Sequence, residues 1–474
     1  MTLHPLTTTD LTRLLPYFQS QMFRMSDYTA GFQRMWMLYC KNTFTEIHNC
    51  LIIHATLGGK TYFYYPLNLT GNTDEELAAI REVEKYCVLE EIPLRWTSVP
   101  EERLGLLTRR YGRNLTLTNP RTWRDYLYEV KDFVEYAGKH FSGQRNHVRK
   151  FQRLYPEAKF RPFISADLPA VMDFLTKFAE RQHAKNSFIA TEELKGSKIL
   201  LECFDDLKFQ GGLMEYEGNV IGVTLGSLAG ETFVIHIEKA LVDYEGIYPS
   251  IAQAFAKQIM PLGVKYINRE DDAGDCGLRK SKLQYNPMQI LDKYTIVPNR
   301  IVEELDTIPE IVTPRCVLKA VPDEDAPIYA RLASDIHRNR YWGWDWRKDW
   351  AGEGDPRSQW FLDFTRQDFN KRIEVPLGIY NEDHLIGEVC FHNFTYDHTV
   401  ELGVRLLPEA EGNGFATEAM RSIADYALCY WGLEKVTAKC FKENIASKAM
   451  LLASGLRSNG EDETFYYFIR TAKN

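Results

Sequence analysis

The alternation of hydrophobic and polar positions is clearest in the last third of the chain. Apolar runs at 377–380 and 385–391 flank a polar turn and predict a β-hairpin. The next run, 399–407, alternates apolar residues with others, as a strand with one buried face does. From Ala416 to Leu428 apolar residues recur with a period of about 3.6, which predicts a helix. We therefore expect a mixed α/β domain whose early strands are antiparallel.

The first 297 residues contain two further sets of strand-like runs. One set is the hairpin 51–65, which has two glycines at its turn. The other set consists of the runs 211–216, 220–226 and 232–237. Each set has helical stretches beside it, so each predicts a small α/β lobe. Architecture of this kind suits a duplicated unit, although no repeat of residues accompanies it.

The domain boundaries follow from these patterns. Three prolines, Pro298, Pro309 and Pro314, interrupt the stretch 298–314, break regular structure and predict a linker. A strand-like run begins directly after them. The predicted organisation is a first lobe at 1–160, a second lobe at 161–297, a linker at 298–314 and a C-terminal domain at 315–474.

Composition narrows the class of protein. The chain has 474 residues, too many for one ordinary core, and 45% of them are hydrophobic, as in globular proteins. No apolar run reaches the roughly 18 residues that a membrane helix needs, and the first residues lack the pattern of a secretion signal. We therefore expect a cytoplasmic protein. The formal net charge of −8 argues against broad nonspecific nucleic-acid binding, while it allows a local basic face.

The candidate metal ligands form no recognisable set. The nine cysteines are scattered and include no C-x-x-C pair, which is typical of reduced, buried thiols. Three adjacent carboxylates at 270–272 are poor ligands together, because neighbouring side chains diverge on a strand and no histidine completes the set. We therefore predict no metal site.

The candidate chemistry of the C-terminal domain begins at the loop 412–417, Gly-Asn-Gly-Phe-Ala-Thr. Gly412 and Gly414 let the backbone turn tightly and approach a ligand. The loop opens the predicted helix, so free N–H groups and the positive end of the helix dipole point toward its occupant. A pyrophosphate suits such a site, and Thr417 can add a hydroxyl or cap the helix. Because a Gly-x-Gly turn before a helix can equally be structural, this motif alone decides nothing.

The residues around the loop carry more information. The runs 402–408 and 411–420 are followed by 444–447 and then by Gly455-Leu456. With this spacing they resemble the GNAT acetyltransferase superfamily, especially its ribosomal-protein N-acetyltransferase branch. The resemblance extends from about residue 313 to the end of the chain.

The resemblance implies a domain that transfers an acyl group, in the first place acetyl, from acyl-CoA to a small-molecule or peptide amine. Backbone groups of a splayed strand would hold the pantetheine and polarise the thioester carbonyl, and a carboxylate would relay the proton of the amine through water. The implied cofactor-binding residues are Val404, Leu406, Gly412, Asn413, Gly414, Phe415, Ala416 and Thr417. The implied catalytic residues are Glu401, Glu388, Asn444 and Ser447. Both glutamates could equally be solvated strand carboxylates.

Several positions depart from the pattern of the superfamily or leave alternatives open. Glu411 places an acidic side chain near the expected pyrophosphate, where the superfamily often has Gln or Arg. Leu451 stands where the superfamily frequently has a tyrosine that protonates the leaving thiolate, and Ser447 is a poor replacement. A tryptophan-rich stretch at 341–350 provides either an aromatic wall for the acceptor or core anchors, and we favour the second.

The most unusual segment of the N-terminal half is the charged stretch 266–287. Together with 123–128, 144–147, 236–240 and 246–250, it resembles the C-terminal catalytic domain of phosphatidylglycerol lysyltransferases. The resemblance implies two GNAT-like lobes, related to the Fem-type peptidoglycan aminoacyltransferases, that can take an aminoacyl group from tRNA. With the C-terminal domain, three GNAT-like lobes are expected. The implied substrate-binding residues are His236, Glu238, Asn268, Arg269, Glu270, Asp271, Arg279, Lys280, Lys282 and Arg145.

Basic residues between 139 and 153 predict a basic helix, which could meet a tRNA acceptor end or a phosphate-bearing lipid head, or could simply be an exposed face. A loop at 246–250 replaces the Gly-x-Gly turn, so we do not expect CoA in this half. We predict an enzyme, a CoA-dependent N-acyltransferase fused to an aminoacyltransferase-like region. One alternative is an aminoacyl-tRNA-dependent aminoacyltransferase with a weakly active C-terminal domain. The other is a noncatalytic N-terminal module that binds tRNA, lipid or peptide.

Overall fold

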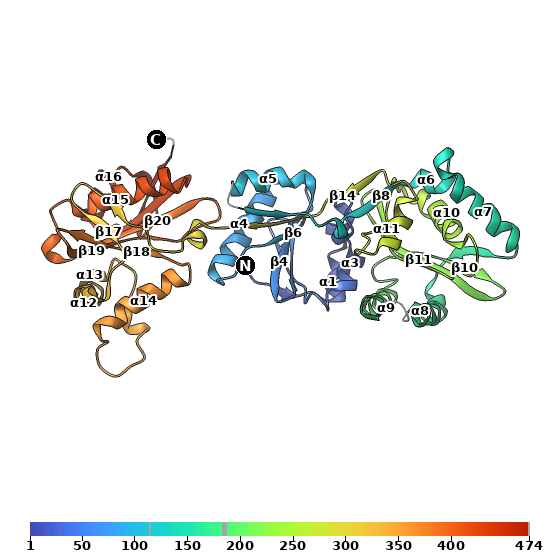
Figure 1. The fold of residues 1–474 in the computed structure, drawn as a ribbon, viewed down its shortest axis with the longest axis horizontal. Helices are drawn as coiled ribbons and strands as arrows, with labels where there is room; N and C mark the ends of the chain where they lie inside the picture. Colours follow the sequence, from blue (N-terminus) through green and yellow to red (C-terminus); the bar gives the residue numbers. More distant parts are fainter. Residues whose placement is uncertain (113–114, 183–186, 473–474) are drawn as a thin grey trace. The chain divides into compact units, whose positions relative to one another are not determined.

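The computed structural model describes residues 1–112, 115–182 and 187–472. The chain packs into two compact units. Unit 1 comprises Met1–Leu107 and Thr116–Val297, and unit 2 comprises Thr108–Leu115 and Pro298–Asn474. Unit 1 holds two mixed sheets and unit 2 holds a third, each flanked by helices (Figure 1). The predicted α/β class, with three helix-flanked mixed sheets, is confirmed.

The first sheet of unit 1 has the strand order β1-β2-β3-β4-β6-β15-β7, with β5 paired to β3. The predicted hairpin of β3 and β4 is antiparallel, with His54 opposite Phe63. Strand β15 returns from the end of unit 1 and pairs with β6. The strands are β1 (His4–Pro5), β2 (Thr43–Ile47), β3 (Cys50–Leu57), β4 (Lys60–Tyr64), β5 (Leu67–Asn68), β6 (Trp96–Val99), β7 (Leu115–Thr118) and β15 (Tyr294–Pro298). The helices are α1 (Thr8–Arg13), α2 (Leu15–Ser20), α3 (Ala30–Trp36), α4 (Thr73–Leu89) and α5 (Glu101–Tyr111).

The second sheet has the order β14-β8-β13-β12-β11-β10-β9. Strands β10, β11 and β12 form the predicted antiparallel meander, and β12 and β13 are parallel. The strands are β8 (Asp125–Glu129), β9 (Lys159–Pro162), β10 (Gln210–Tyr216), β11 (Asn219–Ala229), β12 (Thr232–Ala240), β13 (Tyr266–Asn268) and β14 (Gln289–Leu291). The helices are α6 (Val130–Glu135), α7 (Ser142–Leu154), α8 (Leu168–Gln182), α9 (Ser187–Glu202), α10 (Ile247–Ile259) and α11 (Cys276–Leu283).

The passage from the first sheet to the second differs from the division expected at residue 160. Strand β8 pairs with both β13 and β14, so residues 125–160 belong with the second sheet. The chain changes sheets between β7 and β8. Because the first four residues of β8 are all buried, the strand shows no alternation of hydrophobic and polar positions that the sequence could reveal.

The sheet of unit 2 has the order β16-β17-β18-β19-β20-β21-β23-β22. Helices α15 and α16 cover one face, and α12, α13 and α14 cover the other (Figure 1). The strands are β16 (Ile311–Val312), β17 (Val317–Lys319), β18 (Val375–Asn381), β19 (His384–His392), β20 (Thr399–Leu406), β21 (Lys435–Phe441), β22 (Arg457–Glu461) and β23 (Phe465–Thr471). The helices are α12 (Ala326–Ser334), α13 (Ile336–Asn339), α14 (Ser358–Asn370), α15 (Phe415–Asp425) and α16 (Ile445–Ala453).

The stretch 298–314, expected to be a linker, is packed into unit 2. Val302 is fully buried in the main core of that unit, and Ile311 lies in β16 and is buried as well. Prolines end the regular elements here, as predicted, but the apolar side chains between them hold the segment against the sheet.

A parallel strand pair separates early in each unit. In unit 2, β20 pairs with β21 only over Thr399–Glu401 and then continues to Leu406 beside β19. In unit 1, β12 pairs with β13 only over Thr232–Val234 and continues to Ala240 beside β11. Each separation leaves one edge of the longer strand without a neighbouring strand, and its backbone N–H and C=O groups are available to a ligand there.

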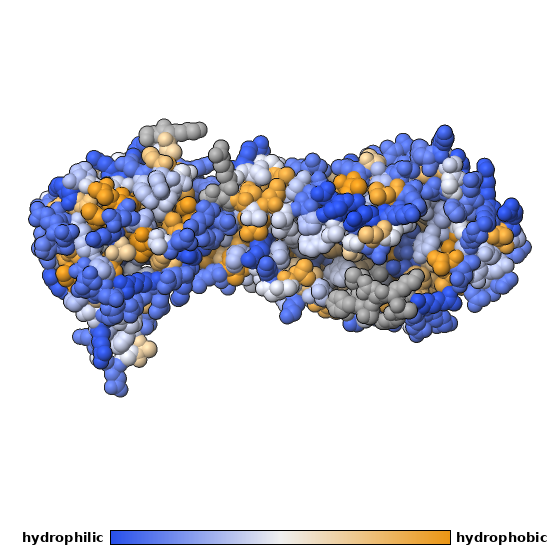
Figure 2. Space-filling model, in the orientation of Figure 1, coloured by the Kyte–Doolittle hydropathy of each residue, from blue (hydrophilic) through white to orange (hydrophobic). Residues whose placement is uncertain are grey.

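Hydrophilic residues cover most of the face shown in Figure 2, with hydrophobic residues in small separate groups. The exposed large hydrophobic side chains are scattered along the chain, for example Leu89, Val242 and Tyr430. Such scattered residues are ordinary on a water-facing surface. Across the described ranges, the structure contains no helix that is both long and apolar enough to cross a membrane.

Candidate functional site

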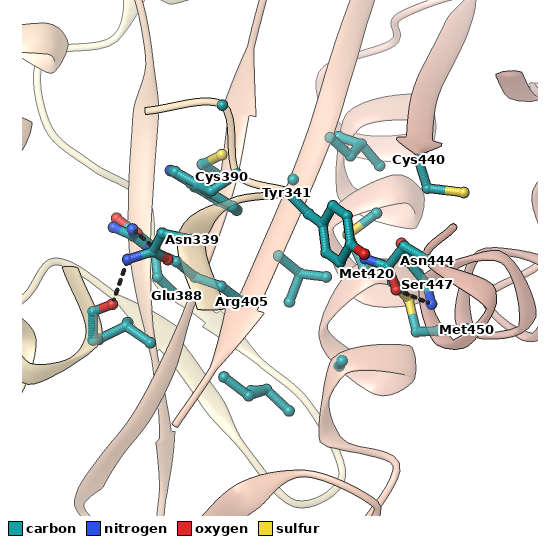
Figure 3. Close-up of a pocket in the computed structure, with 18 of the residues that line it drawn as sticks. Asn339, Tyr341, Glu388, Cys390, Arg405, Met420, Cys440, Asn444, Ser447 and Met450 are labelled. Carbon is teal, nitrogen blue, oxygen red and sulfur yellow. Dashed lines mark hydrogen bonds and ion pairs between the residues drawn. The ribbon is translucent and has the colours of Figure 1, made fainter. Parts of the chain in front are cut away.

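Unit 2 contains a cavity of about 1560 Å³ on the sheet beside β20. The loop 412–417, the open end of β20, the start of α16 and the segment 339–344 all contribute to its wall. Figure 3 shows the side chains of this wall converging from strands β19 and β20, from α15 and α16 and from the 339–344 segment. The cavity therefore brings together the loop 412–417 and the start of α16, the two motifs of the predicted acyl-CoA site, which are separate along the chain.

The glycines of the loop 412–417 have the conformation that the motif predicted. Gly412 and Gly414 have φ values of 76° and 79°, in the left-handed region that favours glycine. Gly414 directly precedes α15, and no side chain of the described residues caps that helix end. The first N–H groups of α15 are therefore free to bind an anion, and the helix dipole favours negative charge there.

Arg315 supports this helix start. Its Nη1 donates to the carbonyl of Asn413 at 3.0 Å, and its guanidinium lies over the ring of Phe415 at 4.7 Å. The same side chain pairs with Glu418 at 2.7 Å. Arg315 thus holds the loop in place and adds positive charge near it. The acidic Glu411 also lines the cavity, so one negative charge remains close to the proposed anion site.

Glu388, expected as a proton relay, lines the cavity and has two partners. It is buried, pairs with Arg405 at 2.5 Å and accepts a hydrogen bond from the Tyr329 hydroxyl at 2.6 Å. Arg405 also donates to Asn339 and stacks on the ring of Trp342 at 4.5 Å. This network ties the 339–342 segment to β20 (Figure 3), and the proton-relay role of Glu388 stays a prediction.

Glu401 is half-buried and lines the cavity. Its carboxylate accepts from Asn393 at 2.9 Å and lies 3.3 Å from the ammonium of Lys439. Strand pairing places His392 directly opposite Glu401, so both side chains point to the same face of the sheet. Burial lowers the pKa of His392, which keeps its imidazole neutral near pH 7.

Glu374 is a third titratable residue on the cavity wall, one position before β18. Burial, with the nearby charge of Glu388 as a smaller cause, raises the pKa of Glu374 to about 8. Neither His392 nor Glu374 was predicted from the sequence. The signal for His392 was available, since it lies on the same face of β19 as Glu388. Glu374 precedes its strand and carries no such signal.

Asn444 and Ser447 meet at the start of α16. The Asn444 side chain caps the helix by accepting from the Ser447 N–H at 3.1 Å, and both residues line the cavity. Leu451 is buried, so no acid stands at that position. Tyr341 also lines the cavity, and its hydroxyl points toward Asn444 and Ser447 in Figure 3. A phenol is therefore present on this wall, supplied by a different element.

The tryptophans of the stretch 341–350 fill both of the roles expected for them, as core anchors and as part of the cavity wall. Trp344 and Trp346 pack, with Trp360, against the small core around α12 and α14. Trp342 instead lies over β20, where a Cβ on Gly403 would be 3.2 Å from its ring. Core anchoring thus describes most of these residues, while Trp342 forms part of the cavity wall.

The charged segment after β13 in unit 1 is ordered by internal pairs. Asp272 is completely buried and accepts from Arg279 at 2.9 Å and from the Tyr126 hydroxyl at 2.6 Å. The Arg279 guanidinium holds the pKa of Asp272 well below its usual range. Lys282 is buried and donates to the carbonyl of Arg269 at 2.6 Å. Arg279 and Lys282, both expected to bind substrate, thus also hold the loop, and their part in substrate binding stays a prediction.

Two other residues expected at this site lie apart from it. Arg145 donates to the carbonyls of Tyr136 and Gly138 at the start of the basic segment, so it is a structural residue. Lys280 is exposed on α11. No group of three or more His, Cys, Asp or Glu side chains able to hold a metal ion occurs within the part of the chain that the structure describes.

A β-bulge in β12 separates His236 from Glu238. The register between β11 and β12 shifts at this point, and His236 is the extra residue. His236 hydrogen-bonds to Glu270 at 2.8 Å, whereas Glu238 pairs with Arg269, whose guanidinium lies over Tyr285. The two residues therefore serve different surroundings and do not form one subsite.

Of the other predicted residues of this region, Asn268 is fully buried and Asp271 is partly buried. Asn268 donates to Asp125 at 2.8 Å and to the carbonyl of Arg24 at 2.7 Å. Burial raises the pKa of Asp271 to about 6. Lys293 pairs with both Asp125 and Asp27, which the sequence did not indicate.

Helix α10 holds the position in unit 1 that α15 holds in unit 2, after the strand that leaves its parallel partner. Its N-terminal residue Gly246 has φ 88°, but a Cβ there would lie 2.3 Å from the carbonyl oxygen of His147 in α7. The His147 carbonyl oxygen thus packs closely against Gly246 at this helix start. The expectation that CoA does not bind here stays a prediction.

The fold and the cavity define an acyltransferase, and comparison with known proteins specifies its family. The family model "Phosphatidylglycerol lysyltransferase, C-terminal" matches residues 22–297, and "Acetyltransferase (GNAT) domain" matches residues 315–457. The first match covers more than half of the chain, so the chain belongs to the family of phosphatidylglycerol lysyltransferase C-terminal domains. Both predicted resemblances are confirmed.

Individual relatives and solved structures each match one part of the chain. The uncharacterized N-acetyltransferase YoaA of Bacillus subtilis is 27% identical over 162 residues, which are 34% of this chain and 89% of that protein. A conserved protein of unknown function from Bacteroides thetaiotaomicron is 25% identical in its crystal structure, with a TM-score of 0.60, and covers 63% of this chain and 100% of its own. The structure of L-PGS from Bacillus licheniformis is 13% identical, with a TM-score of 0.46 and coverages of 63% and 94%.

Proposed function

We propose that unit 2 transfers an acyl group, acetyl in the first place, from acyl-CoA to an amine. The observation that carries this proposal is the uncapped start of α15 behind Gly412 and Gly414, which opens into a cavity continuing along the free edge of β20. The N–H groups of residues 412–417 would bind the pyrophosphate. The edge of β20 at Val404 and Leu406 would hold the pantetheine by backbone hydrogen bonds.

The proposed chemistry is direct attack of the amine on the thioester carbonyl. Backbone N–H groups of β20 would stabilise the oxyanion that develops there. Glu401 would take the proton of the amine through water, with the neutral His392 beside it. Glu388 would act indirectly, by holding Arg405 and Trp342. The leaving thiol has an ordinary pKa of about 8.5, so it departs without an obligatory acid, and Tyr341 could donate a proton to it.

Calorimetry with acetyl-CoA tests this function. Gly414→Trp should abolish binding, because the side chain would fill the space in front of α15. Gly58→Trp is a matched control, since Gly58 also has a positive φ and open space around it but lies in unit 1. Absence of binding to the wild-type chain, or equal binding by Gly414→Trp, would refute the CoA site.

We further propose, as a second function, that unit 1 takes an acyl group from an aminoacyl-tRNA and passes it to an amine or lipid acceptor. The observation that favours a donor other than CoA is the His147 carbonyl at the start of α10. Arg149 and Arg153 are exposed on α7 and would meet the phosphates of the tRNA.

Filter binding of charged tRNA across a salt series tests this second function. Neutralising Arg149 and Arg153 to Gln should reduce the slope of log affinity against log salt by about 2, because each phosphate contact releases about one counterion. Lys177→Gln and Arg181→Gln on α8 form a control pair, since both side chains already pair with carboxylates. An unchanged slope would remove α7 from the binding surface.

A further inference from the structure

Three side chains of unit 1, Ser227, His236 and Glu270, are linked in a row by hydrogen bonds. None of them belongs to the cavity of unit 2. Ser227 Oγ lies 2.8 Å from His236 Nε2, and His236 Nδ1 lies 2.8 Å from Glu270 Oε1. With Glu270 ionised, Nδ1 donates to the carboxylate and Nε2 accepts the serine proton. Because both ring nitrogens are engaged, the orientation of the imidazole is fixed.

The backbone is shaped around this imidazole. His236 is the extra residue of the bulge in β12, where Leu225 faces Ile237 and the next residue, Gly226, faces Ile235. A Cβ on Gly226 would lie 2.0 Å from the Val234 carbonyl oxygen. A Cβ on Gly31 of α3 would lie 2.2 Å from His236 Nε2. Glycine is thus required at both positions, and bulges of this kind are frequent beside active sites.

Glu270 is held in a conformation that a non-glycine residue rarely adopts. Its φ is +57°, which costs about 1 kcal/mol for an L-residue. Its N–H donates to Asn268 Oδ1 at 2.6 Å, and its carbonyl accepts from the Tyr126 N–H at 3.2 Å. Such strain persists only where the surroundings over-determine it. The carboxylate is therefore anchored from the backbone as well as from His236.

The exposed fraction of each side chain shows which end of the Ser227–His236–Glu270 row a ligand can reach. The His236 side chain is 0% exposed and Ser227 is 6% exposed, whereas the Glu270 side chain is 24% exposed. A serine nucleophile would need the opposite arrangement, with its hydroxyl at the substrate. The accessible group here is the carboxylate. Ser227 and His236 lie behind it as a support.

The Ser227–His236–Glu270 row lies where strands β12 and β13 separate. Glu270 follows the end of β13 by two residues, and His236 follows the paired part of β12 by two residues. In unit 2, Gly403 follows the paired part of β20 by two residues and lines the cavity proposed for the thioester. The Ser227–His236–Glu270 row thus occupies, in unit 1, the topological place of the acyl-transfer site of unit 2.

We propose that Glu270 is the proton acceptor of an acyl-transfer centre in unit 1, and that His236 and Ser227 are positioning residues that hold its carboxylate. The inference rests on the second function proposed above. The attacking atom of the acceptor forms a bond to the donor's carbonyl carbon and gives its proton to Glu270. The ester C–O bond of the donor then breaks, and the departing hydroxyl oxygen collects that proton. Water in place of the acceptor gives hydrolysis by the same path.

Hydrolysis provides an assay that needs no identified acceptor. The full chain is mixed with tRNA charged with labelled amino acids, and protein-dependent release of the label is followed. Glu270→Gln should lower kcat about 100-fold, as expected for loss of a general base. His236→Gln and Ser227→Ala should lower kcat about 10-fold with KM within twofold, and Ser227→Thr should restore most of the rate. Glu231→Gln, which removes an exposed carboxylate paired with Lys265, is the control and should have no effect.

The outcomes separate this inference from the function on which it rests. No release of label by the wild-type chain would overturn both. If the wild type releases label and Glu270→Gln keeps more than half of that rate, only the role of Glu270 is overturned. A histidine-selective NMR spectrum supplies a readout independent of turnover, in which His236 should carry its proton on Nδ1 and lose this signature in Glu270→Gln. A proton on Nε2 in the wild type would overturn the positioning role.

Discussion

Among the side chains that line the cavity of unit 2, exposure distinguishes two glutamates that each have two partners. The Glu388 side chain is 2% exposed and is bound by Arg405 and Tyr329, whereas the Glu401 side chain is 16% exposed. Glu401 has one amide and one ammonium partner and retains access to the cavity. His392 is held neutral by burial. We therefore propose Glu401, with His392 beside it, as the proton acceptor and Glu388 as a positioning residue.

Glu374 makes the stability of unit 2 dependent on pH. Its pKa is about 8 in the folded chain, against about 4.3 for an unfolded glutamate. Between these values the folded state keeps a proton that the unfolded state has released, so the free energy of unfolding falls as the pH rises. Glu374→Gln should remove that loss and stabilise the protein by about 4 kcal/mol at pH 9 relative to pH 5.

Thermal unfolding of the full chain at pH 5 and pH 9 measures this difference. Glu463→Gln, an exposed carboxyl of the β22–β23 turn, is the matched control and should show the same small effect at both values. Equal effects of Glu374→Gln at the two pH values would contradict the raised pKa.

Glu411 should weaken the binding of CoA by charge repulsion. It lines the cavity beside the loop 412–417, where the pyrophosphate is proposed to bind. Glu411→Gln should tighten the binding of acetyl-CoA about two- to fivefold, since an exposed charge pair contributes about 0.2–1 kcal/mol. The gain should disappear in high salt. Calorimetry at two salt concentrations checks this prediction, and weaker binding by Glu411→Gln would show that the carboxylate assists the site.

At the scale of elements, periodicity revealed the strands and the helix that build the cavity. The hairpin β18–β19, strand β20 and helix α15 follow the predicted patterns, and the loop 412–417 precedes α15 as expected. Periodicity could not reveal β8, whose first four residues are all buried, or the packing of 298–314 against the sheet. It also carries no information on cross-strand partners, so the pairing of Glu388 with Arg405 and the separation of His236 from Glu238 required the structure.

The bulge in β12 is the element on which the unit 1 site depends. Gly226→Ala would place a methyl group 2.0 Å from the Val234 carbonyl, so the ladder must shift and the bulge must open. We expect a loss of about 2 kcal/mol of stability, in the range of overpacked core substitutions, together with loss of the His236 signature in the NMR spectrum. Gly143→Ala on α7 has open space around its Cβ position and should instead be neutral or slightly stabilising. Unchanged NMR signals in Gly226→Ala would contradict the importance of the bulge.

At the scale of the whole molecule, a parallel strand pair separates beside a set of titratable side chains in each unit. In unit 2 the helix that follows the long strand has a free N-terminus, and in unit 1 the corresponding start is filled by the His147 carbonyl. We therefore propose a phosphate site at this position in unit 2 and none in unit 1. This difference is the physical basis for assigning two kinds of acyl donor to one chain.

Acetyl-CoA should stabilise unit 2 without stabilising unit 1. Ligand at 100 times its Kd adds about 2.7 kcal/mol to the free energy of unfolding of the unit that binds it. Hydrogen exchange of the full chain resolves the two units, and protection should rise in the peptides of β20 and α15. Peptides of β12 and α10 should stay unchanged. Increased protection of α10 would contradict the assignment of CoA to unit 2 alone.

The most direct test of the central claim is a crystal structure of the full chain soaked with CoA. The account predicts one CoA per chain, with its pyrophosphate on the N–H groups at the start of α15 and its pantetheine along the free edge of β20. It predicts no CoA at the start of α10. Pyrophosphate density at α10, or an empty α15 site at a CoA concentration that saturates binding in solution, would contradict it.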